Sequence, residues 1–531
     1  MSLFCCIWIQ ATIYATGILR ATFLLIKITP KGSTHTSGLS GVGKFILLKV
    51  FVVISKKTVL RSAIIAASVA PALALASGYK INEQSASGVG TAYAGRAAVA
   101  EDASVVFYNP AAMTELKRAE LTVGATYIDA KGEMSNGSKT NAAGLPDAYE
   151  PVYSDKGDYI PNPTIPFVYY VRPLDEKMAV GLGVFVPFGT NTDYKSNSTA
   201  GGFADETMLK VIDIQPSFAY KLNDDISVGG GIDIVYAQAL LSKQTDLIPY
   251  VPTAVQNTGG VLDNPAYMGY ENTYEVKGDD WAYGWNLAMF WKLSDKTTFG
   301  ATYRSQIDIE FRGDSKFVND GNVYFYNKGT NQILPIGAVN GNGSTVAGKQ
   351  ASKVPLSTPQ SVTLSLAHQA TDALQLQAGA TWTDWSVFQN LDILATEDGV
   401  FNKISGLGGD YVGHIEENWK DTIAYALGGT YTLNEQWLVR AGYAYDDAAV
   451  TVENRTARVP DNDRQWLTAG FRFTATQDIS VDVGAAYLLF HPAKLNERDN
   501  NVDGSQKGLS TVQGDYDVDA MALSMQLNYK M

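Results

Sequence analysis

Histidine, the side chain that most often carries acid–base or metal chemistry, is scarce in this chain. The 531 residues include four histidines, and the last three are His368, His414 and His491, each in a different sequence context. No Ser, His and Asp follow one another at a spacing typical of hydrolases, and no His and Cys cluster has the spacing of a metal site. We therefore predict that the protein is not an enzyme and binds no metal or cofactor.

Two short motifs resemble ligand-binding loops without completing them. Gly38–Lys44 resembles a phosphate-binding loop, but Phe45 stands where a Ser or Thr would bind Mg²⁺. Asp499–Gly504 begins like a calcium loop, but Ser510 stands where the bidentate Glu belongs. We interpret the first as a chance match and the second as an external loop, for which weak calcium binding stays open.

Any functional site in this chain must be positioned by β-strands. From about Leu121 to the last residue, apolar residues recur at every second position, which is typical of β-strands. The clearest stretch places these residues on one face: Trp281, Tyr283, Trp285, Leu287, Met289, Trp291 and Leu293. In a transmembrane barrel such a face meets lipid and the polar face meets the lumen.

The next stretch repeats the pattern. Its apolar face, predicted to meet lipid, consists of Phe299, Ala301, Tyr303, Ile307, Ile309 and Phe311. Its polar face, predicted to line the lumen, carries Arg304, Gln306, Asp308 and Glu310. A soluble β-sandwich also alternates, but it explains charged residues on the inner face poorly.

About fourteen strands are predicted, and short turns alternate with long polar loops between them. The strands are expected at 119–130, 164–172, 178–188, 213–222, 226–241, 280–293, 297–312, 358–370, 373–385, 419–433, 436–448, 463–475, 478–490 and 516–531. The long loops are expected at 131–163, 189–212, 242–279, 313–357, 386–418, 449–462 and 491–515. A bilayer tolerates no open sheet edge, so the fold class is an all-β, 14-stranded antiparallel transmembrane β-barrel.

The N-terminal region divides into three parts. Lys56, Lys57 and Arg61, an apolar stretch and Ala74-Leu-Ala76 form a signal-peptide pattern over 56–76, which makes Ser77 the expected mature N-terminus. Residues 1–55 are interpreted as a probable upstream mis-start or an extension, with a membrane anchor as the alternative.

Residues 77–118 do not alternate, and they are rich in small residues. The segment contains Asn109-Pro110-Ala111, a turn that leads into a short helix, and apolar residues such as Tyr79 and Ile81. The lumen of a 14-stranded barrel is wide enough to hold it. We predict an N-terminal plug at 77–118 and a barrel at 119–531, rather than a flexible tail before the barrel.

These motifs together resemble a known family. Ser77-Gly-Tyr-Lys-Ile-Asn-Glu, Asn109-Pro110-Ala111, Thr302-Tyr303-Arg304-Ser305 and Val459-Pro-Asp-Asn-Asp-Arg464 are similar to segments of long-chain fatty-acid outer-membrane transporters of the FadL/TodX type. The resemblance covers essentially all of 77–531. It implies a plugged barrel that takes up hydrophobic molecules by diffusion.

The resemblance also implies site residues. Lys243 and Lys403 match basic positions that contact the ligand carboxylate in the family. Strand residues Pro187, Phe188 and Gly189 match a kink that opens a lateral exit into the bilayer. Pro187 donates no ladder hydrogen bond, so it could also simply end the strand.

Apolar residues of the plug and the expected loops are candidates for the hydrophobic ligand site. They are Tyr79, Phe203, Leu209, Leu262, Tyr267 and Met268. Apolar loop residues often only pack against each other. In the family, however, the corresponding loops form a groove that captures ligand.

The predicted function is passive transport of long-chain fatty acids across the bacterial outer membrane. One alternative is a channel for aromatic or alkane hydrocarbons, and another is a general porin or a structural or phage-receptor barrel. The expected surroundings are outer-membrane lipid and lipopolysaccharide, with assembly machinery reading the terminal strand. The formal charge of −13 argues against nucleic-acid binding.

Overall fold

The computed structural model describes residues 8–13, 18–25, 46–53, 78–140, 154–195, 198–244, 260–261, 273–318, 323–327, 332–336, 339–340, 344–345 and 349–531. The predicted signal peptide and Ser77 lie outside these residues. The chain divides into two units, 1–68 and 69–531. The first contains an antiparallel sheet of β1 (Trp8–Ile13), β2 (Ile18–Leu25) and β3 (Ile46–Val53). Among the described residues, no helix is long and apolar enough to cross a membrane.

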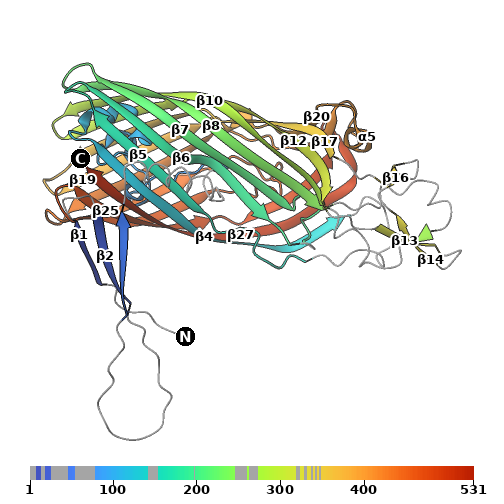
Figure 1. Cartoon of the computed structure of the whole chain (residues 1–531). Coiled ribbons are helices and arrows are strands. Elements are labelled where there is room, and N and C mark those ends of the chain that lie inside the picture. Colours follow the sequence, from blue (N-terminus) through green and yellow to red (C-terminus); the bar gives the residue numbers. More distant parts are fainter. Residues whose placement is uncertain are drawn as a thin grey trace, which may run out of the picture. The chain divides into compact units, whose positions relative to one another are not determined.

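The second unit is a closed antiparallel β-barrel, seen from the side in Figure 1. Its strand segments are β4 (Glu120–Thr140), β5 (Thr164–Pro173), β6 (Met178–Asp193), β7 (Glu206–Lys221), β8 (Ile226–Gln244), β10 (Thr273–Ser294), β11 (Thr297–Arg304), β12 (Ile307–Val318), β17 (Lys349–Thr358), β18 (Ser361–Gln369), β19 (Leu374–Thr383), β20 (Asn390–Ala395), β21 (Tyr411–Glu416), β22 (Thr422–Thr432), β23 (Trp437–Asp446), β24 (Arg464–Thr474), β25 (Ile479–Phe490), β26 (Ala493–Asn500) and β27 (Gln506–Lys530). Five of the fourteen strands are interrupted, so each consists of two successive segments. Pairing of β27 with β4 closes the barrel.

The predicted alternation is confirmed: the apolar residues point to the outside of the barrel, and the residues between them point inside. In β10, Trp281, Tyr283 and Leu287 are 54%, 70% and 57% exposed, whereas the intervening Ala282 and Asn286 are buried. In β27, Met521 and Met525 are exposed and Gln526 is buried. The apolar face is thus the outer surface, where a membrane barrel meets lipid.

The strands extend further than predicted on the side of the long connections. For example, β4 continues to Thr140, β10 begins at Thr273 and β27 begins at Gln506. The expected loops 131–163, 189–212, 242–279, 313–357, 386–418 and 491–515 therefore all contain strand residues, and their predicted bounds were wrong. Alternation fades in these extensions because beyond the lipid both faces of a strand can be polar.

One prediction about faces was also wrong. Ile307, Ile309 and Phe311 are at most 5% exposed and lie inside the barrel, while Asp308 points outward. The reason is the interruption at 305–306 between β11 and β12, which reverses the faces. Arg304, before the interruption, lies in the lumen as predicted and contacts luminal groups.

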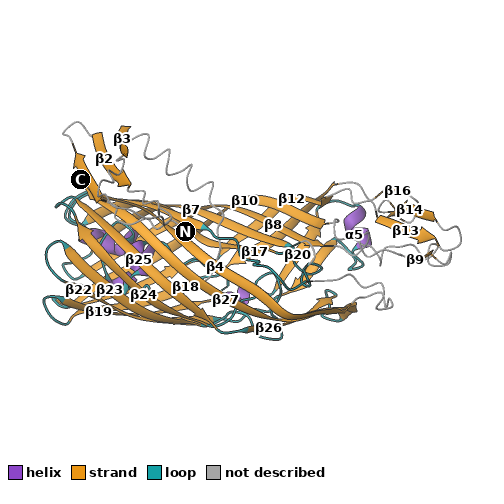
Figure 2. Ribbon diagram, turned by 90° about the horizontal axis from the view of Figure 1, so that it is seen from below, coloured by secondary structure: helices purple, strands orange, loops and turns teal. Residues whose placement is uncertain are grey.

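Residues 78–118 form the predicted plug. Its helical elements are α2 (Ala86–Val89), η1 (Arg96–Ala98), α3 (Val105–Tyr108) and η2 (Pro110–Glu115). Figure 2 shows purple helices behind the strands near β25, and close contacts join Gly484 of β25 to Ala86 and Gly90 of the plug. Asn109 caps η2 by accepting a hydrogen bond from the Ala111 N–H at 3.0 Å.

Smaller elements lie in the connections. They are β9 (Gly260–Val261), β13 (Val323–Asn327) and β14 (Gln332–Ile336), which form one sheet, β15 (Val339–Asn340) and β16 (Ser344–Thr345), which form another, and the helices η6 (Trp385–Val387) and α5 (Val400–Ile404).

Candidate functional site

The barrel wall has a seam between β5 and β6. The two strands pair from Pro173↔Ala179 to Val168↔Val184, but the next four residues of β5, 164–167, pair only with β4. On the other side of β6, Val186 and Pro187 stand opposite a single residue of β7, Ile212. One extra residue in a strand makes a β-bulge, which bends the strand away from its neighbour. A β-bulge therefore lies at Pro187, and β6 does not end there but continues to Asp193.

A segment of the plug pairs with β6 at the position where β5 does not. The Ile81 N–H donates to the Pro187 carbonyl and the Gly189 N–H donates to the Tyr79 carbonyl, both at 2.8 Å. Lys80 and Phe188 form the β-bridge between these two bonds. The backbone groups that the bulge frees from the wall are thus satisfied by the plug, as buried backbone groups require.

Tyr79 lies in a cluster of aromatic rings. Its ring centroid is 4.6 Å from that of Trp385 and 5.6 Å from those of Phe388 and Trp419. Its hydroxyl donates to the Ser357 carbonyl at 2.8 Å. Gly78 permits this packing: its φ is +60°, and an added Cβ would lie 2.3 Å from the Trp419 ring. We call Tyr79, Phe188, Trp385, Phe388 and Trp419 the aromatic cluster.

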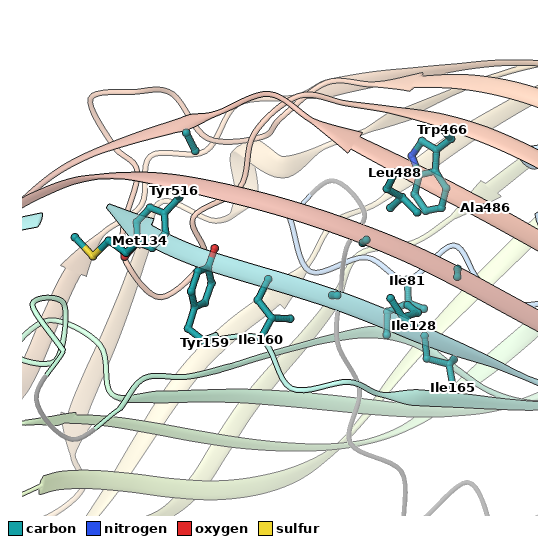
Figure 3. Close-up of a cluster of buried hydrophobic side chains, with 14 of the residues drawn as sticks. Ile81, Ile128, Met134, Tyr159, Ile160, Ile165, Trp466, Ala486, Leu488 and Tyr516 are labelled. Carbon is teal, nitrogen blue, oxygen red and sulfur yellow. The ribbon is translucent and has the colours of Figure 1, made fainter. Parts of the chain in front are cut away.

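Ile81 lies in a second apolar cluster behind the seam. Figure 3 shows it beside Ile128 of β4 and Ile165 of β5, and all three side chains are buried. Further along the same cluster, Tyr159 and Tyr516 pack with ring centroids 5.2 Å apart. An apolar side chain of the plug therefore covers the inner side of the seam.

An acid at the edge of the aromatic cluster has a raised pKa. Glu417 lies in the connection between β21 and β22, and its carboxyl accepts a hydrogen bond from the Trp419 indole N–H at 2.9 Å. Burial raises the pKa of Glu417 from 4.5 to about 8. Burial thus disfavours the charged form of this carboxyl, although the Trp419 and Thr456 side chains donate to its oxygens.

We expect the aromatic cluster to loosen in alkaline solution. Burial raises the pKa of Glu417 in the folded protein. Its contribution to the stability of the fold is therefore full below about pH 4.5, declines above that pH and is lost as the pH rises through about 8. Conductance of single barrels in planar bilayers should therefore increase between pH 7 and pH 9. Glu417→Gln keeps a neutral acceptor for Trp419 and should give the same conductance at both values; an equal rise in this variant would contradict the assignment.

The structure places the two predicted headgroup lysines on neighbouring elements. Lys243, near the end of β8, is the register partner of Tyr274 in β10. Phe401, two residues before Lys403 in α5, packs against Tyr274 at 5.6 Å. However, the Lys403 ammonium lies 3.6 Å from the Asp398 carboxylate, and both side chains are well exposed.

A third lysine, which the sequence did not single out, is influenced by the charge of Lys243. Lys507 of β27 is half-buried, donates a hydrogen bond to the Ser405 carbonyl and interacts electrostatically with Lys243. It lies within the expected loop 491–515, and no motif marks it. Lys507 and Lys243 lie on strands that do not pair with each other, so only the tertiary structure brings out their interaction.

The apolar candidates are divided between the two clusters. Leu209 is buried in the group that contains Tyr79, and Phe203 packs against the group that contains Ile81. Leu262, Tyr267 and Met268 lie outside the described residues. A cavity of about 50 Å³ lies where the two clusters approach the plug N-terminus, and its lining includes Gly78, Tyr159 and Phe490.

Buried ion pairs connect Glu101 and Asp102 of the plug to the barrel wall. The Arg440 guanidinium, with a fully buried side chain, lies 2.7 Å from Asp482 of β25 and 2.8 Å from Glu101 of the plug. Arg472 of β24 binds Asp482 and the plug residue Asp102 at 2.8 and 3.0 Å. We call these five residues the ionic cluster. Sequence patterns did not indicate it, because its members come from three distant segments.

The chain is similar to known outer-membrane proteins. Residues 67–531 match the family described as outer membrane protein transport protein (OMPP1/FadL/TodX). A long-chain fatty acid transport protein of Escherichia coli (strain K12) is 31% identical over 456 residues, which cover 83% of this chain and 95% of that protein. Outer membrane protein P1 of Haemophilus influenzae is 31% identical over 433 residues, covering 78% and 86% of the two chains.

Solved structures share the fold. The crystal structure of a Pseudomonas aeruginosa FadL homologue matches with a TM-score of 0.69 at 24% identity, covering 85% of this chain and 99% of that one. The Pseudomonas putida toluene transporter TodX matches with a TM-score of 0.54 at 17% identity, covering 81% and 94%.

Proposed function

Because the chain belongs to the OMPP1/FadL/TodX family of outer membrane transport proteins, we propose that it takes up long-chain fatty acids by passive diffusion. The ligand binds at the outer end of the barrel, moves along the apolar clusters and leaves sideways through the seam between β5 and β6. Outer-membrane lipid receives it there. The barrel also contacts lipopolysaccharide, and assembly machinery reads its terminal strand.

The observation that carries this proposal is the apolar interior above an interrupted wall. Ile307, Ile309 and Phe311 turn inward and join the group around Tyr79, so the outer half of the lumen has an apolar lining. Removing such a lining from water favours an apolar ligand, by roughly 25 cal/mol per Å² of buried surface. A polar solute gains nothing from it, and the plug occupies the lumen, which argues against an open porin.

The route is already occupied by groups of the plug. Tyr79 fills the aromatic cluster and Ile81 covers the seam, and both side chains are at most 2% exposed. A fatty acid chain that competes for the same surfaces must displace this short segment. Two backbone hydrogen bonds hold the segment on β6, so its release frees the seam without unfolding the barrel.

For the carboxylate headgroup, Lys243 and Lys507 provide two neighbouring cations, and Lys403 is a third at the surface. Two like charges held close together favour a shared anion. An ammonium binds it as a point charge, without the fork geometry of Arg.

A hydrocarbon channel is the second candidate, and the composition of the aromatic cluster favours it. Its five rings offer surfaces for a small aromatic ligand, which needs no cation. The two candidates therefore differ in their dependence on the lysines.

Equilibrium binding of oleate and toluene to the purified barrel tests the proposal. Lys243→Ala with Lys507→Ala should weaken oleate binding by about tenfold or more, since each charge-assisted hydrogen bond contributes roughly 1.5–3 kcal/mol. Toluene binding should not change.

Lys403→Ala alone is the matched control, because its exposed pair with Asp398 contributes little. An equal loss of oleate binding in Lys403→Ala alone would move the headgroup site to Lys403. Toluene binding without any oleate binding would favour the hydrocarbon channel.

A further inference from the structure

Lys80 is a cation in the middle of the plug segment that occupies the seam. Its backbone bridges Phe188, and it lies between Tyr79 and Ile81. Within the part of the chain that the structure describes, its ammonium makes no hydrogen bond or ion pair. A largely enclosed ammonium without a partner is costly, since a buried charge is normally paired.

Two cavities meet at Lys80. One, of about 70 Å³, lies toward β18, β19 and β22 and is lined by hydroxyl groups such as those of Thr363, Thr381 and Thr422. The other, of about 30 Å³, lies directly behind the bulge of β6, and its lining includes Pro187 and Phe188. Each volume is sufficient for water. The Lys80 side chain thus lies between a polar cavity and the inner side of the seam.

The other charged groups around these cavities have interactions of their own, although Asp446 and Arg304 also act electrostatically on Lys80. Asp446 lies 3.7 Å from Arg464, and Asp233 lies 3.2 Å from Arg304. Arg304 also donates to the Phe107 carbonyl and to Gln215, both at 2.8 Å. The buried carboxyl of Asp213 faces Asp233 and lines the smaller cavity.

We propose that Lys80 is an inner binding site for the carboxylate of a ligand that is leaving through the seam. This inference rests on the proposed transport of fatty acids and adds a second anionic site to it. The aliphatic chain passes between β5 and β6, and the carboxylate reaches the Lys80 ammonium behind Pro187. Without the Lys80 ammonium, the carboxylate would enter a cavity whose other cation, Arg304, is already paired with Asp233.

A carboxylate bound at Lys80 also affects how the plug closes the seam. Lys80 and Phe188 form the bridge that holds the plug segment on β6, between the bonds from Ile81 and to Gly189. A ligand held by the Lys80 side chain thus lies against the residues that must separate for its exit.

Uptake of oleate and of oleyl alcohol by cells without a transporter of their own tests this site, since the two ligands differ in the charge of the headgroup. Lys80→Met keeps the length of the side chain and removes the charge. We expect oleate uptake to fall by about tenfold, the factor of one charge-assisted hydrogen bond, and oleyl alcohol uptake to stay unchanged. Lys80→Arg should retain oleate uptake within about twofold, because it restores the charge.

Lys117→Met is the matched control, because it removes an exposed lysine at the end of the plug segment. Unchanged oleate uptake in Lys80→Met would overturn the proposal. So would an equal loss of both ligands, which would show that Lys80 only holds the plug in place. Failure of the proposed function is distinct from both, since the wild-type protein would then take up no more oleate than cells without it.

Discussion

Deletion of Pro187 should reduce oleate uptake to the level of cells that lack the protein. The bulge contains one residue more in β6 than in β7, between Phe185↔Asp213 and Phe188↔Val211. Removing Pro187 lets the ladder continue without interruption, and β6 can then pair with the free end of β5. The seam closes, while the loops and the outer lysines are unchanged. Uptake of radiolabelled oleate by whole cells measures the effect.

Binding of oleate to the purified variant should stay within about twofold of the wild type, because capture occurs at the outer end. Pro187→Ala is the matched control. It keeps the number of residues in the bulge and should therefore retain uptake. Wild-type uptake in the deletion variant would contradict the seam as the exit.

Arg440→Met should release the plug segment around Glu101 and Asp102 from the barrel wall. The change leaves Glu101 without its shortest ion pair and removes one of two arginines from Asp482, in a site where both Arg440 and Asp482 are fully buried. Loss of one partner from a buried ion pair costs roughly 3–5 kcal/mol. We expect a clear rise in the conductance of single barrels in planar bilayers, because the plug no longer fills the lumen at all times.

Arg118→Met provides the comparison, since Arg118 pairs with Asp478 at 2.6 Å at an exposed position. Exposed pairs contribute about 0–1 kcal/mol, so its conductance should match the wild type. If Arg440→Met also conducts like the wild type, the ionic cluster does not retain the plug.

The faces of the membrane-spanning strands could be predicted from the sequence because lipid imposes the alternation directly. Tyr283 and Leu287 point outward, and the alternation of residues within their own strand is enough to predict this. An irregularity in the ladder of β6 could also be expected, since Pro187 lacks the N–H that a ladder needs. The same reasoning failed for Ile307 and Ile309, where the interruption at 305–306 reverses the faces and nothing local in the residues indicates it.

What the sequence alone determined is therefore what depends on neighbours along the chain: the alternating strands, the turns and the small-residue plug. What only the tertiary structure decided depends on groups that are distant in sequence. Lys243 and Lys507 interact electrostatically although their strands do not pair, and Tyr79 enters a cluster with Trp385 and Trp419. Strand period two fixes which way a side chain points, but closure of the barrel and docking of the plug decide which side chains meet.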